Sequence, residues 1–144
     1  MNFEGAFDFQ APREKVWNFI VDPNMIGMCL PDLKTLETES EDKFRAVIRV
    51  GIGVIRGDLQ FRLAILEKEP PSSVRLKSHA TGPGSNVDID VIINLLEIPA
   101  GTRLVYKTDV KVGGLMAGLA QHVLAEAAER TIKSIFECIG KQVT

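Results

Sequence analysis

Few side chains in this 144-residue chain are suited to acid–base, nucleophilic or metal chemistry. The two histidines, His79 and His122, lie far apart in the sequence, and neither has a Cys, Asp or Glu at the spacing of a metal-ligand motif. Alternation places His79 on the polar, solvent-facing side of its strand. No serine stands in a G-x-S-x-G nucleophile motif. We therefore expect no metal site and no bound cofactor.

The segment Gly51-Ile52-Gly53, with Gly57 shortly after it, is close to the glycine loop of a dinucleotide site. Arg56, however, stands where the third glycine of G-x-G-x-x-G belongs. A strand pattern follows instead of a helix, so no helix N-terminus would face a pyrophosphate. We interpret this segment as a hairpin.

Tyr106 is the single tyrosine, and its alternation phase is that of an inward-facing strand residue. A buried hydroxyl needs a partner, which here is either a structural hydrogen bond or the polar head of a ligand. Ser78, Thr108 and His122 are the other polar groups available to an interior. An enzyme built on this chain would have to find its acid or base among these four residues.

The two cysteines, Cys29 and Cys138, match no zinc, redox or disulfide framework. A buried free cysteine behaves as a small hydrophobic residue. We expect both to be core residues and not functional thiols.

Length and composition indicate one globular domain, residues 1–144. Hydrophobic residues make up 45% of the chain and charged residues 25%, which is typical of a chain that folds alone. The net charge is −2 with both signs interspersed, so we expect no nucleic-acid partner. No signal peptide opens the sequence, and no apolar run reaches the ~18 residues of a bilayer span. We therefore expect a cytoplasmic protein.

The first elements are predicted by periodicity and by two prolines. Alternation from Phe3 to Phe9 predicts a half-buried strand. Pro12 suits the first turn of a short helix, and Asp22-Pro23 can end that helix and cap a second one that runs to about Cys29.

The rest of the chain predicts a sheet and one long helix. From Leu33 to Val112 the apolar residues alternate through six more strands, and the short turns between them make neighbouring strands antiparallel. After Gly113-Gly114 the period becomes helical, from about Leu115 to Ile139. The predicted fold class is therefore α+β, a seven-stranded curved antiparallel sheet around a long C-terminal helix.

A curved sheet cannot touch one straight helix everywhere, because twist makes its inner face concave. The two surfaces diverge at one end, and the gap is either filled by side chains or left open for an apolar ligand; the residue pattern favours neither. We expect the short-helix segment and the start of the long helix to border the same opening. The predicted cavity residues are Met25, Ile26, Met28, Phe61, Leu63, Val91, Ile93, Tyr106, Leu119 and Val123. The predicted rim residues are Gly51, Gly53, Gly82, Gly84, Leu115, Met116 and His122.

Four segments together resemble one known family. They are F-x-F-Q-A-P-R-E-K-V-W-x-F-I-x-D-P (Phe7 to Pro23), C-L-P-D-L (Cys29 to Leu33), V-G-x-G-V-I-R-G-D-L (Val50 to Leu59) and T-R-L-V-Y-K-T-D-V-K-V-G-G-L (Thr102 to Leu115). The chain is similar to CoxG, the G subunit of carbon monoxide dehydrogenase, within the START/Bet v 1-like (SRPBCC) superfamily. The resemblance implies a helix-grip fold with a hydrophobic cavity and a role beside a carbon monoxide dehydrogenase-type molybdenum hydroxylase. Many relatives add a C-terminal apolar anchor, whereas this chain ends at Thr144, so we expect at most peripheral membrane contact.

Three functions are compatible with these patterns. The first is non-enzymatic binding of a quinone-like or lipid-like molecule in the cavity. The second is assembly or docking of a partner enzyme through the apolar rim, without ligand carriage. The third is a cyclase or dehydratase that uses the interior polar groups, and we favour it least because so few such groups exist.

Overall fold

The computed structural model describes residues 1–144. Its elements follow the predicted order of one strand, two short helices, six strands and a long helix, with a short 3-10 helix before the last element. The strands are β1 (Asn2–Phe9), β2 (Leu33–Ser40), β3 (Lys43–Ile52), β4 (Ile55–Glu69), β5 (Ser73–Gly82), β6 (Ser85–Ile98) and β7 (Gly101–Gly114). The helices are α1 (Arg13–Ile20), α2 (Pro23–Gly27), η1 (Leu115–Gly118) and α3 (Gln121–Val143).

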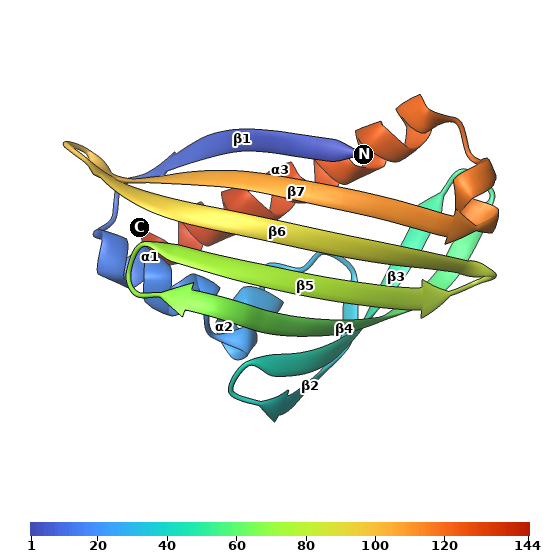
Figure 1. Ribbon diagram of the computed structural model, residues 1–144, viewed down its shortest axis with the longest axis horizontal. Coiled ribbons are helices and arrows are strands. Elements are labelled where there is room, and N and C mark those ends of the chain that lie inside the picture. The colour runs from blue at the N-terminus through green and yellow to red at the C-terminus, as the bar shows by residue number, and fades with distance from the viewer.

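All seven strands form one antiparallel sheet in the order β1-β7-β6-β5-β4-β3-β2. Successive strands from β2 to β7 are neighbours because short turns join them, and β1 adds to the far edge by pairing with β7. α3 lies behind this sheet, and no helix covers the opposite face (Figure 1). The predicted fold class is confirmed.

The two short helices begin as the prolines predict. Pro12 is the N-cap of α1, and the Asp22 carboxylate accepts a hydrogen bond of 3.0 Å from the backbone N–H of Asn24 at the start of α2. Val16, Trp17 and Ile20 form the buried side of α1. These local signals were sufficient because each cap acts within one turn.

The long helix begins later than its period predicts. Leu115–Gly118 forms the separate helix η1, and Leu119 and Ala120 are extended, so α3 starts at Gln121 and continues to Val143. The backbone N–H of Met116 donates to Ser85 Oγ (3.0 Å), and that of Leu115 donates to the Gly84 carbonyl (2.9 Å). These two bonds tie η1 to the β5–β6 hairpin, and so the chain cannot run straight into α3.

The interior is divided into two apolar clusters. The larger cluster joins α1, the residues after α2 and the C-terminal half of α3 to the sheet, and the smaller one joins η1 and the start of α3 to the hairpin ends. A helix rises about 1.5 Å per residue, so Gln121 and Cys138 lie about 25 Å apart along α3. The short helices and the start of α3 therefore border opposite ends of the molecule, and the prediction that they share one opening is wrong (Figure 1).

Cys29 and Cys138 form a disulfide, with 5.4 Å between their Cα atoms. Both pack in or against the larger cluster as predicted, but the expectation that they are free core residues is wrong. The bond joins the segment after α2 to the last part of α3, across a sequence separation of 109. Framework motifs are local patterns, and a single pair so far apart leaves no such pattern in the sequence.

Candidate functional site

The space between α3 and the concave face of the sheet is the candidate site. α3 comes close to β1 near one edge of the sheet and to β3 near the other, whereas its backbone stays farther from the central strands. The sheet bends around the helix, and the helix spans the two sides of the bend (Figure 1). The space between α3 and the central strands must therefore be filled either by side chains of these elements or by a ligand.

The side chains that face this space are apolar and mostly half-buried. Phe61, Leu63 and Val91 lie on the inner face, as alternation predicted, and each keeps part of its surface exposed, while Ile93 is buried. Ile132 and Ile135 of α3 are also half-buried against the larger cluster. A fully packed core would bury such residues, so this middle layer presents apolar surface that protein atoms do not cover.

Ser78 places one polar group in this apolar layer. It lies on β5 between Leu63 of β4 and Ile89 of β6, and only 6% of its surface is exposed. Its buried Oγ has no hydrogen-bond partner. Thr102 and Thr108 differ, because each donates to a backbone carbonyl, at 2.7 and 2.9 Å. An unpaired buried hydroxyl costs free energy unless a further group binds it.

Tyr106 faces inward, as predicted, at the β1 side of the same space. Its ring lies 5.2 Å from that of Phe136 and 6.3 Å from that of Phe7, measured between centroids. A Cβ on Gly5 would stand only 3.0 Å from the Tyr106 hydroxyl, so a side chain there would press against the phenol. Burial raises the pKa of this phenol, and the nearby Glu129 carboxylate raises it further. The structural hydrogen bond considered for this hydroxyl is absent.

A shallow hollow of about 450 Å³ opens at the η1 end of the molecule, and we call it the apolar hollow because most of its lining residues are hydrophobic. Six of its eight lining residues are hydrophobic, among them Val110 and Val112 of β7 and Leu119 and Leu124 beside η1 and in α3. Leu119, one of the predicted cavity residues, therefore does line a hollow. The size lies in the range of roughly 300–1,000 Å³ that is usual for small-molecule sites.

Other predicted cavity residues lie elsewhere. Met25 and Met28 of the α2 segment are exposed by 43% and 57%, because their helix turns them to solvent, so their placement on the cavity wall is wrong. Ile26 packs against the larger cluster, away from the apolar hollow. Val123 is half-buried in the first turn of α3.

The structure places most of the residues predicted for the rim at the η1 end of the molecule, and Met116 and His122 differ from the rest. Gly51 and Gly53 lie in the β3–β4 hairpin and Gly82 and Gly84 in the β5–β6 hairpin, as predicted, and Leu115 is 64% exposed beside them. Met116 is not a rim residue, because the bonds that hold η1 bury it to 2% exposure in the smaller cluster. His122 is turned to solvent and does not border the interior, so it cannot supply an interior acid or base.

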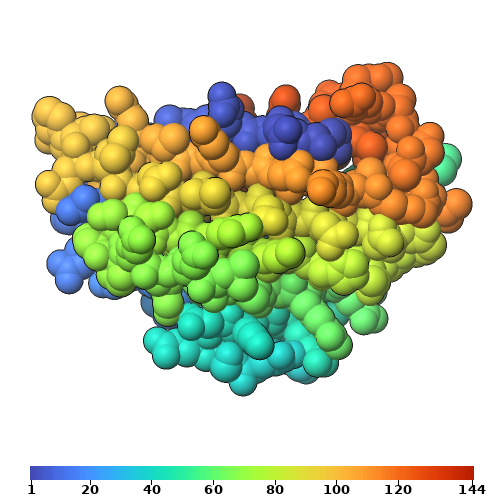
Figure 2. All heavy atoms as spheres, in the orientation of Figure 1, coloured from blue at the N-terminus to red at the C-terminus, as the bar shows by residue number.

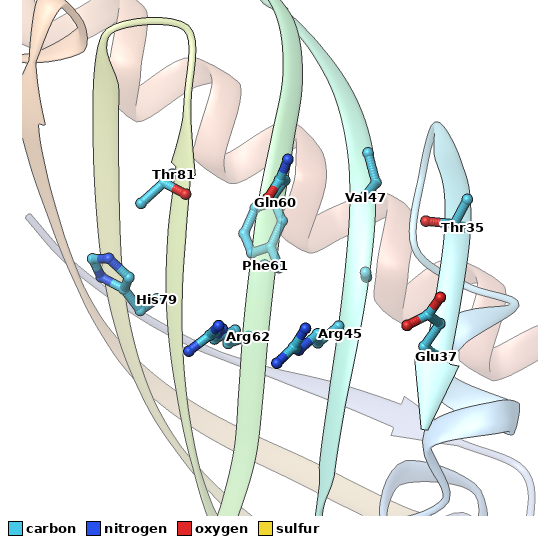
Figure 3. Close-up of a pocket in the computed structure, with 10 residues that line it drawn as sticks. Thr35, Glu37, Arg45, Val47, Gln60, Phe61, Arg62, His79 and Thr81 are labelled. Carbon is cyan, nitrogen blue, oxygen red and sulfur yellow. The ribbon is translucent and has the colours of Figure 1, made fainter. Parts of the chain in front are cut away.

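A second hollow, of about 420 Å³, lies on the outer face of the sheet over β2 to β5. We call it the outer groove, and its polar lining residues lie on the side away from α3 (Figure 3). They are Glu37, Arg45, Arg62, His79, Gln60 and Thr81. The predicted solvent-side position of His79 is confirmed, and its Nδ1 lies 2.6 Å from Asp88 Oδ1. In the space-filling view the middle of this face is formed by strand residues, and helix residues appear only at its edges (Figure 2).

In neither hollow is a hydroxyl group hydrogen-bonded to a histidine or a carboxylate that could act as its general base. No group of three or more His, Cys, Asp or Glu side chains is placed to hold a metal ion. What the interior offers chemically is an apolar surface with two hydroxyl groups, Ser78 and Tyr106, that form no hydrogen bonds with the protein.

Comparison with known proteins agrees with this geometry. The family model described as the G subunit of carbon monoxide dehydrogenase (CoxG) matches residues 5–144. This chain belongs to the CoxG family. A conserved protein from Geobacillus kaustophilus has a similar crystal structure, with a TM-score of 0.92 and 28% identity over 99% of this chain and 95% of that one. No curated protein matches the sequence.

More distant structures share the fold. A START superfamily protein from Mycobacterium smegmatis superposes with a TM-score of 0.75 at 11% identity, covering 99% of this chain and 96% of that one. A protein from Thermus thermophilus gives 0.74 at 16% identity, covering 99% and 97%. This CoxG chain thus has a START-like helix-grip fold. None of its helices combines the length and the apolar character that crossing a membrane requires.

Proposed function

We propose that this CoxG protein is a non-enzymatic accessory protein that binds an apolar small molecule, of quinone or lipid type, between α3 and the concave face of the sheet. The observation that carries the proposal is the half-buried apolar layer that surrounds the unpartnered Ser78 hydroxyl. A ligand in this layer would remove apolar surface from water and would give that hydroxyl a partner. The apolar hollow at η1 is the entrance in this proposal.

The family description names the partner that we propose. CoxG is described as a subunit of carbon monoxide dehydrogenase, so we propose that the protein works beside a molybdenum hydroxylase of that type. In this proposal it carries its ligand to or from the enzyme.

Ligand binding is tested on the full chain by native mass spectrometry and by calorimetric titration with a short-chain ubiquinone analogue and with a fatty acid. Leu63 and Leu66 lie on the same strand, but Leu63 faces the interior and Leu66 is exposed on the outer face. We expect Leu63→Trp to fill the space and abolish binding, and Leu66→Trp to bind like the wild type. Saturable binding to neither probe, or equal loss in both variants, would argue against carriage.

One observation also supports a docking role. Val54, at the tip of the β3–β4 hairpin, is 88% exposed, and the exposed Leu115 lies at the same end of the molecule. These two apolar side chains are available for contact with a partner at this end of the molecule. A pull-down of the hydroxylase that fails with Leu115→Asp, together with no saturable ligand binding by the wild type, would favour docking without carriage. Leu115 is the appropriate site for this test because the buried Met116 would not tolerate a charge.

A further inference from the structure

The outer groove departs from the charge pattern of the rest of the sheet. Several outward cations face acids across the strands, as in Asp8 opposite Arg103, Glu4 opposite Lys107 and Arg49 opposite Asp58. Arg45 and Arg62 are the only two arginine or lysine residues that stand directly opposite each other. Like charges in opposed strand positions destabilise a sheet, so fold stability does not explain this pair.

Arg62 has no counter-charge among the outward residues that lie side by side across β3, β4 and β5. Its neighbours across β3 and β5 are Arg45 and His79. Arg45 forms an ion pair with Glu39 and stands opposite Glu37, which also lines the groove. His79 contacts Asp88, whereas no carboxylate lies within ion-pair distance of Arg62. The one opposed pair of acids in the sheet, Asp90 and Asp109, is different, because both carboxylates have cationic partners.

Neutral hydrogen-bonding groups stand beside this guanidinium. Gln60 and Thr81 are opposed to each other on the same face, and both line the outer groove with Arg62 (Figure 3). A guanidinium binds carboxylate and phosphate through two parallel hydrogen bonds, and an amide and a hydroxyl can bind the remaining oxygens. Val47 adds an apolar wall, and the volume of about 420 Å³ accommodates more than a bare ion.

We propose that the outer groove binds a small organic anion, with Arg62 as the principal contact to its carboxylate or phosphate group and Gln60 and Thr81 as hydrogen-bonding partners. The groove lies on the face opposite α3, so this site is separate from the proposed apolar ligand site and does not depend on it.

The test is titration of the full chain with inorganic phosphate and with succinate, followed by NMR of the backbone amides. We expect saturable shifts centred on β4 and β5, and a dissociation constant raised about tenfold or more in Arg62→Gln, as for loss of a charge-assisted hydrogen bond. Arg62→Lys keeps the positive charge but loses the planar guanidinium that can donate two parallel hydrogen bonds. Its dissociation constant should fall between those of the wild type and Arg62→Gln. Saturation by either probe supports the site.

Arg130→Gln is the matched control, since it removes the same charge from an exposed position of α3 on the other side of the sheet. Its affinity should equal that of the wild type. Equal weakening in Arg62→Gln and Arg130→Gln would show a general charge effect, and shifts that do not saturate would show no site; either result overturns the proposal. The melting temperature of each variant verifies that it is folded.

Discussion

At the scale of single residues, Ser78 is the group whose position is hardest to explain by folding alone. Its buried hydroxyl has no partner, so Ser78→Ala removes an unsatisfied group and should leave the free energy of unfolding unchanged or raise it by about 1 kcal/mol. Thr102→Val is the contrasting variant, because Thr102 donates to the Ala11 carbonyl, and it should lower stability by about 1 kcal/mol. Urea unfolding measures both changes. If Ser78→Ala is the less stable of the two, Ser78 serves the fold and not a ligand.

The phenol of Tyr106 allows a second prediction, because it is the single tyrosine and its ultraviolet titration is unambiguous. Burial and Glu129 raise its pKa above the ordinary 10.0, so the folded protein holds the phenol proton more tightly than the unfolded chain does. The contribution of this group to stability is therefore constant below pH 10.0 and falls as the pH rises between the unfolded and folded pKa values.

The phenolate absorbance should show a midpoint above pH 10.0 in the folded protein and a return toward 10.0 in denaturant. In Tyr106→Phe the alkaline loss of stability from this group should vanish. A midpoint that is the same in both states would contradict the burial of this hydroxyl.

At the scale of elements, the Cys29–Cys138 disulfide fixes α3 to the segment after α2. Because it closes a long loop, breaking it should lower the free energy of unfolding by about 2–5 kcal/mol. Urea unfolding with and without dithiothreitol measures this effect. The double variant Cys29→Ser with Cys138→Ser should resemble the reduced protein and be insensitive to the reductant. If dithiothreitol does not change the unfolding of the wild type, the disulfide does not contribute to stability.

Two glycines at the ends of η1, Gly114 and Gly118, can be compared to test how firmly this helix is held. Gly114 has φ of +70°, and a Cβ there would overlap the Gly84 carbonyl oxygen, whereas a Cβ on Gly118 meets no atom within 4 Å. Gly114→Ala should therefore destabilise the protein by about 1–3 kcal/mol, and Gly118→Ala should change it by less than about 1 kcal/mol. Thermal unfolding of the two variants compares them directly. Equal effects would mean that η1 is not held against the β5–β6 hairpin as described.

At the scale of the whole molecule, the two apolar clusters with a half-buried layer between them predict that a ligand adds to stability. A molecule that binds only the folded state should raise the free energy of unfolding by about 2.7 kcal/mol at a hundredfold excess over its dissociation constant. Differential scanning calorimetry with the ubiquinone analogue measures the shift. Leu63→Trp should show none, and a similar shift in that variant would place the ligand outside the interior.

Local patterns of residues were enough to define the elements and the faces of the strands. Alternation placed Leu63, Val91 and Tyr106 on the inner face and His79 on the outer face, because a strand has only two sides and the burial of one fixes the other. Asp22 and Pro23 predicted the start of α2, since a cap acts within one turn.

Which ends of the elements meet was settled only by the folded chain. Periodicity shows which face of an element is buried but not where along its length a neighbouring element packs. The α2 segment and η1 were therefore predicted at one opening, although they border opposite ends of α3. The pairing of Cys29 with Cys138, the burial of Met116 and the opposition of Arg45 to Arg62 each join residues from separate elements. Such contacts depend on strand register and on the path of the chain between elements, and the local pattern of residues predicts neither of them.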